Sequence, residues 1–352
     1  MRPRAQSKER QASGAKLEYA TEKLIDAAAT IFASDPRVRS VGVGRHAAAY
    51  GYIAVRNTAA ILPQTTRLIP LEEHEGVPVV FLDSNRDPES LVKLPHSGPG
   101  SPTTASMVPE QARQRPLVSG LQIENYDDDF RTNVIAGGHI IVGTLGCFVQ
   151  FPTGTKGILS NNHVVAGENR GLRGKDQILQ PATGSLNTQD VIGLLTDFVA
   201  LQQSPSGATL AAGNVILNDV DAGTVELNKK SAAVTQGYLP SRKLSPPSGY
   251  AQAQTGDKVF KVGRTTGLTW GEVMQVPTVV GPIPYAPGPC WFRRAIVIEG
   301  QNGTMFSDHG DSGSAIVRDD GKILGLLFAG NGQQTYACPI DTVLQKLKCA
   351  IL

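Results

Sequence analysis

The stretch SDHGDSGSAIV, residues 307–317, places Ser312 between glycines immediately before a short apolar run. Glycine adopts backbone conformations that are closed to other residues, so the loop around Gly310 can turn two N–H groups toward one point beside the serine hydroxyl. Two such donors stabilise the negative oxygen that forms when a nucleophile attacks a carbonyl group. The stretch therefore predicts a nucleophilic serine beside an oxyanion hole.

A general base and an orienting carboxylate precede this serine in the sequence. The stretch LSNNHVVAG places His163 between two amide side chains and an apolar run, and NDVDAGTVEL supplies Asp219 and Asp221 at the start of an apolar strand. The histidine would remove the proton from the serine hydroxyl, and the carboxylate would hold the imidazole in the required tautomer. The order is therefore His, Asp, Ser, with two candidate aspartates.

The second half of the chain has the sequence pattern of an all-β domain. From about Thr132 onward, short apolar segments such as HIIVG, LGCFVQF, AIVIEG and KILGLLFAG are separated by Gly, Asn and Asp turns. This pattern is typical of a sandwich or barrel, and its length suits two packed six-stranded barrels. At the end of the chain a helical stripe of apolar residues predicts a terminal helix: Val343, Leu344, Leu347 and Ile351.

The first half has a different organisation. Apolar residues recur at helical spacing over 17–32, and the three stretches VRSVGVG, AYGYIAVRN and VPVVFLD are predicted to be strands. We expect a small α+β domain over 15–85, a Pro-rich linker over 86–130 and a peptidase domain with a C-terminal helix over 131–352. The predicted fold class is mainly β, a double β-barrel preceded by a small α+β domain.

Composition argues against several classes of partner. Lys and Arg number 33 against 31 Asp and Glu, so a formal net charge of +2 gives no reason to expect nucleic acid. No apolar run approaches the roughly 20 residues that span a bilayer, and no apolar segment of a secretory signal follows the basic amino terminus. We therefore expect no membrane segment and a cytoplasmic location.

The cysteines and histidines give no sign of a metal site. Cys147, Cys290, Cys338 and Cys349 lack paired metal spacing, which favours free thiols that are mostly buried. Four histidines have no carboxylate or cysteine partner at ligand spacing: His46, His74, His96 and His139. No metal and no cofactor is predicted.

Five stretches together carry a resemblance to a known family: LSNNHVVAG, VDAG, GRTTGLTWG, HGDSGS and GLLFAGN. The chain resembles the trypsin-like serine peptidases of the chymotrypsin fold, in particular a bacterial branch related to the plant NARROW LEAF protein. The amino-terminal segments VGVG, YIAVRN, LIP and GVPVVF are similar to the small domain that precedes the peptidase in that branch. The peptidase motifs are much more specific than the amino-terminal ones.

The resemblance implies a role for each candidate residue. His163 would be the general base, Asp221 the orienting carboxylate and Ser312 the nucleophile, with the N–H groups of Gly310 and Ser312 forming the oxyanion hole. Asp221 is preferred because the sequence DAG matches the family's pattern, whereas Asp219 would point to the same side of an extended strand and remains an alternative. Two lesser candidates lie in a segment that reads as an independent strand pair: Asp190 and Asp197.

The aspartate before the nucleophile, Asp311, needs a cation. The segment RTNVIAGGHIIV does not match the start created by zymogen cleavage. By resemblance to bacterial relatives, KVGRTTGLTWG predicts instead that Arg264 neutralises Asp311 and supports the oxyanion loop. The family's register also places Phe306 at the base of the pocket for the residue before the cut, with Ala329 and Gly330 in its wall. Since none of the three is acidic, a preference for small or medium apolar residues is predicted.

The leading functional hypothesis is a serine endopeptidase that acts on proteins or peptides through an acyl-enzyme. A different class, a catalytically silent peptidase fold that serves as a peptide-binding or assembly module, would keep the same residues but lose their geometry. A third possibility is self-processing in the Pro-rich linker. The amino-terminal domain is compatible with recruiting targets, inhibiting the site or joining subunits in a homo-oligomer.

Overall fold

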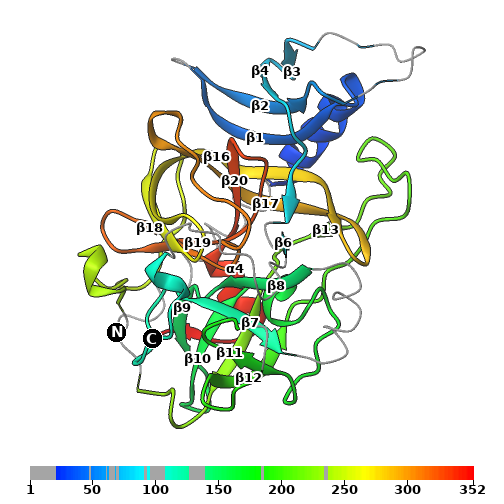
Figure 1. Cartoon of the computed structure of the whole chain (residues 1–352). Helices are drawn as coiled ribbons and strands as arrows, with labels where there is room; N and C mark the ends of the chain where they lie inside the picture. Colours follow the sequence, from blue (N-terminus) through cyan, green and yellow to red (C-terminus); the bar gives the residue numbers. More distant parts are fainter. Residues whose placement is uncertain are drawn as a thin grey trace, which may run out of the picture.

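The computed structural model describes residues 21–46, 49–60, 62, 68, 71–90, 93–95, 108–126, 139–183, 186–233 and 237–352 (Figure 1). β-Strands dominate this part of the chain and form two sheets, one of 12 strands and one of 9. The prediction of a mainly β chain built on two sheets is confirmed.

The larger sheet contains a barrel of six strands. Each strand pairs antiparallel with the next around a closed ring, in the order β15, β16, β17, β20, β19, β18 and back to β15. The strands are β15 (Lys258–Gly263), β16 (Gly267–Tyr285), β17 (Gly288–Gly300), β18 (Ala315–Arg318), β19 (Ile323–Gly330) and β20 (Gln334–Pro339). Their inward side chains include the buried Val259, Val273, Ile298 and Leu327, so the barrel interior is a packed apolar core.

The amino-terminal strands extend this same sheet. β1 (Val38–His46) pairs with the far half of β16, with Ser40 opposite Val280. The sheet then continues through β2 (Ala49–Asn57), β4 (Val77–Ser84) and β3 (Glu73–His74). A helix over 21–34 packs on it, and the Phe32 and Trp291 rings lie 5.1 Å apart. The predicted α+β unit of 15–85 thus shares its sheet with the barrel, and residues 15–20 lie outside the described part.

The smaller sheet curls below the barrel in Figure 1, and we call it the smaller barrel. Its strand order is β21, β9, β10, β14, β12, β11, β7, β8, β6. Apolar side chains from these strands form a second core around Ile123, Leu145, Ile158 and Leu195. The strands are β6 (Lys93–Pro95), β7 (Gln122–Tyr126), β8 (His139–Thr144), β9 (Cys147–Gln150), β10 (Lys156–Ser160), β11 (Gln177–Leu179), β12 (Val191–Phe198), β14 (Gly223–Leu227) and β21 (Ala350–Ile351).

Part of the predicted linker belongs to this second core. Residues 108–126 fall within 86–130, yet Leu117, Leu121 and Ile123 are fully buried and β7 pairs with both β8 and β11. The cause is the apolar sequence after Pro116, which fills the smaller barrel and outweighs the loop-like composition around it. Here the structure differs from the prediction of a continuous linker.

The remaining elements are short. They are β5 (Glu89–Ser90), β13 (Leu217–Asn218), α3 (Asn162–Val165), α4 (Ile340–Leu347) and the 3₁₀ turns η1 (Pro109–Gln111), η2 (Pro240–Arg242) and η3 (Gln301–Gly303). Helix α4 buries Val343, Leu344 and Leu347, whereas Ile351 of the predicted stripe lies in β21. Lys348 at φ +50° ends the helix before that residue. No helix among the described residues is long and apolar enough to cross a membrane.

Candidate active site

The local structure around His163 follows directly from its sequence. β10 ends at Ser160, and the one-turn helix α3 begins at Asn162, so His163 lies at the base of a short turn between two buried strands. Its side chain is fully buried. Its Nδ1 is hydrogen-bonded to Oδ2 of Asp221, and its backbone N–H donates to Oδ1 of the same carboxylate over 3.2 Å. One aspartate therefore fixes both the ring and the backbone of the histidine.

Further groups hold the Asp221 carboxyl in place. The Tyr285 hydroxyl donates to Oδ2 over 2.8 Å. The Asp221 N–H donates to the Cys338 sulfur over 3.2 Å, and the Asn161 side-chain amide donates to the Asp221 carbonyl over 2.7 Å. Burial and the nearby carboxylate raise the pKa of Tyr285 well above its ordinary value, so the hydroxyl keeps its proton and remains a donor. The sequence analysis did not identify Tyr285, Cys338 or Asn161.

The structure brings Asp221 and not Asp219 to the histidine. The Asp219 carboxylate instead accepts from Arg293 over 2.7 Å and from Lys346 over 2.8 Å. The two lesser candidates are also engaged elsewhere, each by an arginine: Asp190 by Arg113 and Asp197 by Arg173. These three carboxylates form ion pairs with neighbouring basic side chains and are not the hydrogen-bond partner of the His163 ring.

The loop that carries Ser312, residues 307–314, lies between the two barrels and is called the serine loop. The Gly313 N–H donates to the Leu327 carbonyl in β19, and the Thr144 N–H at the end of β8 donates to the Ser312 carbonyl, both over 2.8 Å. Gly313 has φ +91°, and a Cβ there would lie 2.2 Å from Ser160 Oγ. Only glycine fits this close approach, so the loop is held by both barrels at once.

His163 follows a strand of the smaller barrel, Ser312 precedes a strand of the larger one, and both residues lie at the boundary between the two. A Cβ on Gly143 would lie 2.4 Å from Val164 Cγ2 and 3.0 Å from the Ser312 carbonyl oxygen, which places the residue after His163 beside the serine. Within the described chain, His163 Nε2 and Ser312 Oγ are both buried without a hydrogen-bond partner. The imidazole nitrogen that a general base uses is therefore unoccupied.

The oxyanion loop has its peptide groups in a defined orientation. The His309 carbonyl accepts from Thr265 Oγ1 over 2.5 Å, and the Gly310 carbonyl accepts from Thr144 Oγ1 over 2.9 Å. Because N–H and C=O point in opposite directions across a trans peptide, the Gly310 N–H faces away from Thr265. No described residue accepts a hydrogen bond from the N–H groups of Gly310 or Ser312.

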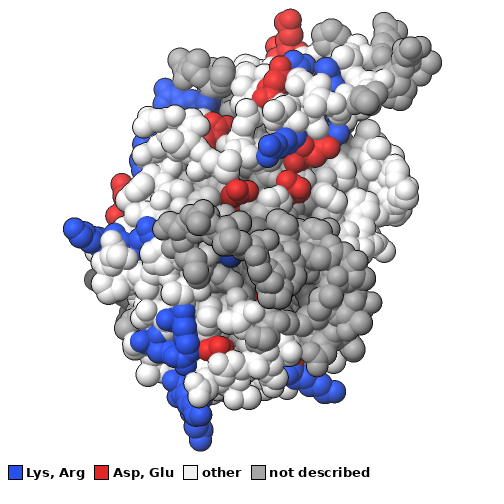
Figure 2. Space-filling view, in the orientation of Figure 1, with Lys and Arg blue, Asp and Glu red and all other residues white. Residues whose placement is uncertain are grey.

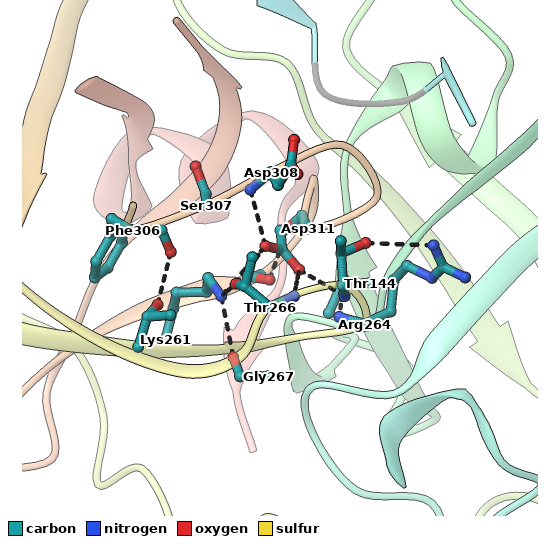
Figure 3. A network of polar contacts seen from close by, with 12 residues as sticks. Thr144, Lys261, Arg264, Thr266, Gly267, Phe306, Ser307, Asp308 and Asp311 are labelled. Atoms are coloured by element: carbon teal, nitrogen blue, oxygen red, sulfur yellow. Dashed lines mark hydrogen bonds and ion pairs between the residues drawn. The ribbon is translucent and has the colours of Figure 1, made fainter. Parts of the chain in front are cut away.

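The cation beside Asp311 is Lys261, which differs from the prediction. Lys261 Nζ lies 3.3 Å from Asp311 Oδ2, and both side chains are fully buried (Figure 3). Burial lowers the pKa of Lys261, and the adjacent carboxylate counters that effect. The Arg264 side chain extends away from the carboxylate and donates to Gln122 and Thr265, each over 3.3 Å.

The hairpin between β15 and β16 explains why Lys261, and not Arg264, pairs with Asp311. Lys261 lies within β15 and points into the interior, whereas Arg264 follows the end of that strand at Gly263. The carboxylate of Asp311 also accepts from the backbone N–H groups of Thr265, Thr266 and Asp308, over 2.8, 3.2 and 3.1 Å respectively. The hairpin therefore holds Asp311 through its backbone, while its lysine supplies the charge.

The predicted pocket residues lie close to this network. Phe306 is almost fully buried, with its ring in the barrel core and Lys261 Nζ 6.0 Å from the ring centre. Ala329 and Gly330 end β19, on the side of the serine loop. Next to Phe306, the Ser307 and Thr335 hydroxyls are hydrogen-bonded over 2.6 Å. None of these residues carries a charge.

Two further observations concern the charged side chains and possible metal ligands of the described residues. On the face in Figure 2, Lys and Arg residues lie in scattered groups with Asp and Glu residues among them. Among the described residues, no cluster of three or more His, Cys, Asp or Glu side chains is placed to hold a metal ion. His96 of the sequence analysis lies outside the described part.

Comparisons with solved structures find serine proteases whose sequence identity to this chain is low. No protein-family model matches the sequence, and no curated protein matches it significantly. The chain is similar to a glutamic-acid-specific serine protease, with 18% identity over 67% of this chain and 100% of that chain and a TM-score of 0.45. It is also similar to the Nocardiopsis protease, with 16% identity over 67% and 98% and a TM-score of 0.44. The similarity to Cellulomonas bogoriensis chymotrypsin has 17% identity over 67% of this chain and 97% of that chain, with a TM-score of 0.43. None of these links the chain to NARROW LEAF, so that narrower resemblance remains a prediction.

Proposed function

We propose that this protein is a serine endopeptidase of the chymotrypsin type. The observation that carries the proposal is the buried His163–Asp221 hydrogen bond, which leaves the other ring nitrogen free at the barrel boundary where Ser312 lies. A histidine with one nitrogen bonded to a carboxylate and the other free is prepared to accept a proton from a hydroxyl group.

Each group has a defined role in the reaction. Ser312 Oγ attacks the peptide carbonyl while His163 Nε2 takes the hydroxyl proton, and the N–H groups of Gly310 and Ser312 stabilise the oxyanion. The imidazolium then gives its proton to the leaving amine, and water hydrolyses the acyl-enzyme by the same route. Asp221, with a hydrogen bond from Tyr285, stabilises the imidazolium throughout.

Substrate preference follows from the uncharged side chains predicted to line the pocket, because the nearby charges of Lys261 and Asp311 are paired with each other. Burying the side chain of a lysine or arginine substrate without a carboxylate partner is costly, so cleavage after small or medium apolar residues is favoured. The nearby Asp308 carboxylate accepts a hydrogen bond from its own neighbour, the His309 N–H, over 2.8 Å. A peptide library digested by the native protein and by Ser312→Ala tests both points. Cuts that require Ser312 and follow apolar residues support the proposal, whereas a dominant cut after Lys or Arg contradicts the preference.

One observation favours a second function, a silent peptidase fold that binds peptides without turnover. Ser312 Oγ has no hydrogen-bond partner in the described chain, although a working triad brings this oxygen to the imidazole. Unliganded sites often have a long contact here that tightens with substrate. If peptides bind to the native protein and remain intact while Ser312→Ala binds them equally well, the silent function is the correct one.

A further inference from the structure

A short segment of the chain lies across the boundary between the barrels, next to the serine loop. β5 pairs antiparallel with the end of β19, with Ser90 opposite Ala329 and Glu89 opposite Gly330. β18 covers β19 only as far as Leu326. The edge of β19 beyond the serine loop would otherwise be open, and β5 occupies it.

The continuation of this segment lies on the other barrel. β6 pairs antiparallel with β8, with Lys93 opposite Ile141 and Pro95 opposite His139. β8 ends at Thr144, which donates to the carbonyl groups of both Ser312 and Gly310. In Figure 1 the segment that follows β4 descends from the amino-terminal strands toward β8. The strands that flank the serine loop on either side thus each carry one strand of this segment.

The connection between these two strands is short. Only two residues, Leu91 and Val92, separate β5 from β6 in the sequence, and both lie outside the described part. The three peptide steps from the end of β5 to the start of β6 span at most roughly 10 Å of extended chain. The two described strands of this segment, one on β19 and one on β8, are therefore separated in the sequence by only a few residues.

Contacts on the amino-terminal side anchor β5. The Glu89 carboxylate lies 3.2 Å from Nε2 of His309, the residue before the oxyanion glycine. Asp87 pairs with Arg39 and accepts from Asn57 over 2.9 Å, which ties the approach to β1 and β2. Pro88 and Ser90 are buried although residues 85–87 are exposed, so the segment is docked from Pro88 onward.

We propose that β5 and β6 occupy the peptide-binding cleft of this protein and exclude other peptides from it. The proposal rests on the proposed function for the identity of the cleft. A strand edge accepts one added strand at a time, so a peptide that pairs with Ala329 and Gly330 must first displace β5. Covalent attachment gives the segment a high effective concentration, which makes it a strong competitor even where its intrinsic affinity is low. The complete burial of His163 and Ser312 is the state expected of a covered site.

The test measures peptide binding and needs no turnover. The probe is a fluorescein-labelled peptide with the sequence of residues 85–99, NRDPESLVKLPHSGP. It is titrated into Ser312→Ala, which cannot cleave it, and into Ser312→Ala carrying Glu89→Pro and Ser90→Pro. Proline removes the backbone donors that β5 offers to β19, and the matched control with Glu89→Ala and Ser90→Ala keeps them.

Displacement of β5 should strengthen binding of the probe by about tenfold or more in the proline variant, because the tethered competitor is lost. The alanine control should stay closer to the parent. Equal affinities in a proline variant that unfolds cooperatively would overturn the proposal. Since no variant in this series turns over, the result is independent of whether the native protein is an active peptidase.

A second measurement applies if the proline variant does not fold. Directly opposed residues on paired strands lie about 4.5–5.5 Å apart at Cα, within reach of a disulfide. Ser90→Cys with Ala329→Cys should therefore form a bond on mild oxidation, detected by peptide mapping, and the oxidised form should bind the probe less well than the reduced form. Failure of the bond to form would overturn the proposal.

Discussion

Lys261 and Asp311 form an ion pair in which both side chains are fully buried, with Nζ 3.3 Å from Oδ2. Asp311 directly precedes the candidate nucleophile, so this pair connects the interior of one barrel to the oxyanion loop. Removing one member leaves an uncompensated charge in the buried interior, which is more costly than removing both. The pair therefore offers a direct test of what holds the loop in shape.

Lys261→Met should lower the free energy of unfolding by roughly 3–5 kcal/mol, because it leaves Asp311 buried and unpaired. Adding Asp311→Asn should restore part of that loss. Arg264→Gln should cost less than Lys261→Met, since the Arg264 side chain reaches Gln122 and Thr265 and not Asp311. Urea unfolding of the four proteins measures these differences. If Arg264→Gln lowers the free energy of unfolding more than Lys261→Met does, the arginine and not the lysine supports the oxyanion loop.

The two neighbouring aspartates provide a matched comparison. Asp221→Asn should reduce kcat by about 10⁴-fold, the size of effect seen when a triad aspartate loses its charge and the histidine takes the wrong tautomer. Asp219→Asn should leave kcat within a few-fold of the native value, because that carboxylate pairs with Arg293 and Lys346 instead. Steady-state hydrolysis of one apolar peptide substrate measures both. Equal effects would show that the geometry around His163 does not describe the working site.

Tyr285→Phe isolates the hydrogen bond to Asp221. The substitution removes only the hydroxyl oxygen, and a hydrogen bond to a charged group contributes roughly 1.5–3 kcal/mol. We expect a loss of that size in the free energy of unfolding, together with a lower kcat, measured by denaturation and by peptide hydrolysis. Tyr238→Phe is the control, because the buried Tyr238 hydroxyl has no partner in the described chain. A smaller loss for Tyr285→Phe than for Tyr238→Phe would contradict the assigned role.

Docking of β5 should depend on pH through His309. The hydrogen bond that His309 donates to the Glu89 carboxylate raises the pKa of His309. Burial opposes this effect, the charges of Glu89 and Asp308 assist it, and the charge of Arg86 opposes it. The pair therefore stabilises docking below the ordinary histidine pKa of about 6.5 and loses that effect as the pH rises through the raised value.

Binding of an 85–99 peptide that carries Gln in place of Glu89 should accordingly strengthen in Ser312→Ala between pH 6 and pH 8.5, because the tethered segment is released more readily while this probe lacks the carboxylate that pairs with His309. Glu89→Gln should flatten this dependence while leaving the folded protein intact. A pH profile that is unchanged by Glu89→Gln would show that the His309–Glu89 pair does not control docking.

The sequence predicted the mainly β fold because alternating apolar segments and glycine turns are local signals. It located His163 and Ser312, since each lies in a short motif, but it could not choose between Asp219 and Asp221 from the residues alone. The family resemblance of KVGRTTGLTWG assigned the cation to Arg264. Lys261, three residues earlier, has the same charge, and only the direction of its side chain within β15 distinguishes the two.

Long-range pairing was beyond local signals. Nothing in β1 indicates that it joins β16 more than 200 residues later in the chain, and nothing in Glu89 and Ser90 indicates that they pair with β19. One missed element did have a signal. In β7 the residues Gln122 to Tyr126 follow Leu121 with alternating apolar and polar side chains up to Glu124, a strand pattern that the surrounding prolines concealed.

The central claim is that His163 activates Ser312 beside a formed oxyanion hole, and covalent labelling by a fluorophosphonate probe tests it most directly. The probe is applied to the native protein, to the Glu89→Pro and Ser90→Pro double variant, and to each of these with Ser312→Ala or His163→Ala. The account predicts that Ser312 is modified, faster in the proline variant than in the native protein, and that either alanine substitution abolishes the label. Absence of label from Ser312 in both the folded native protein and the folded proline variant would contradict it.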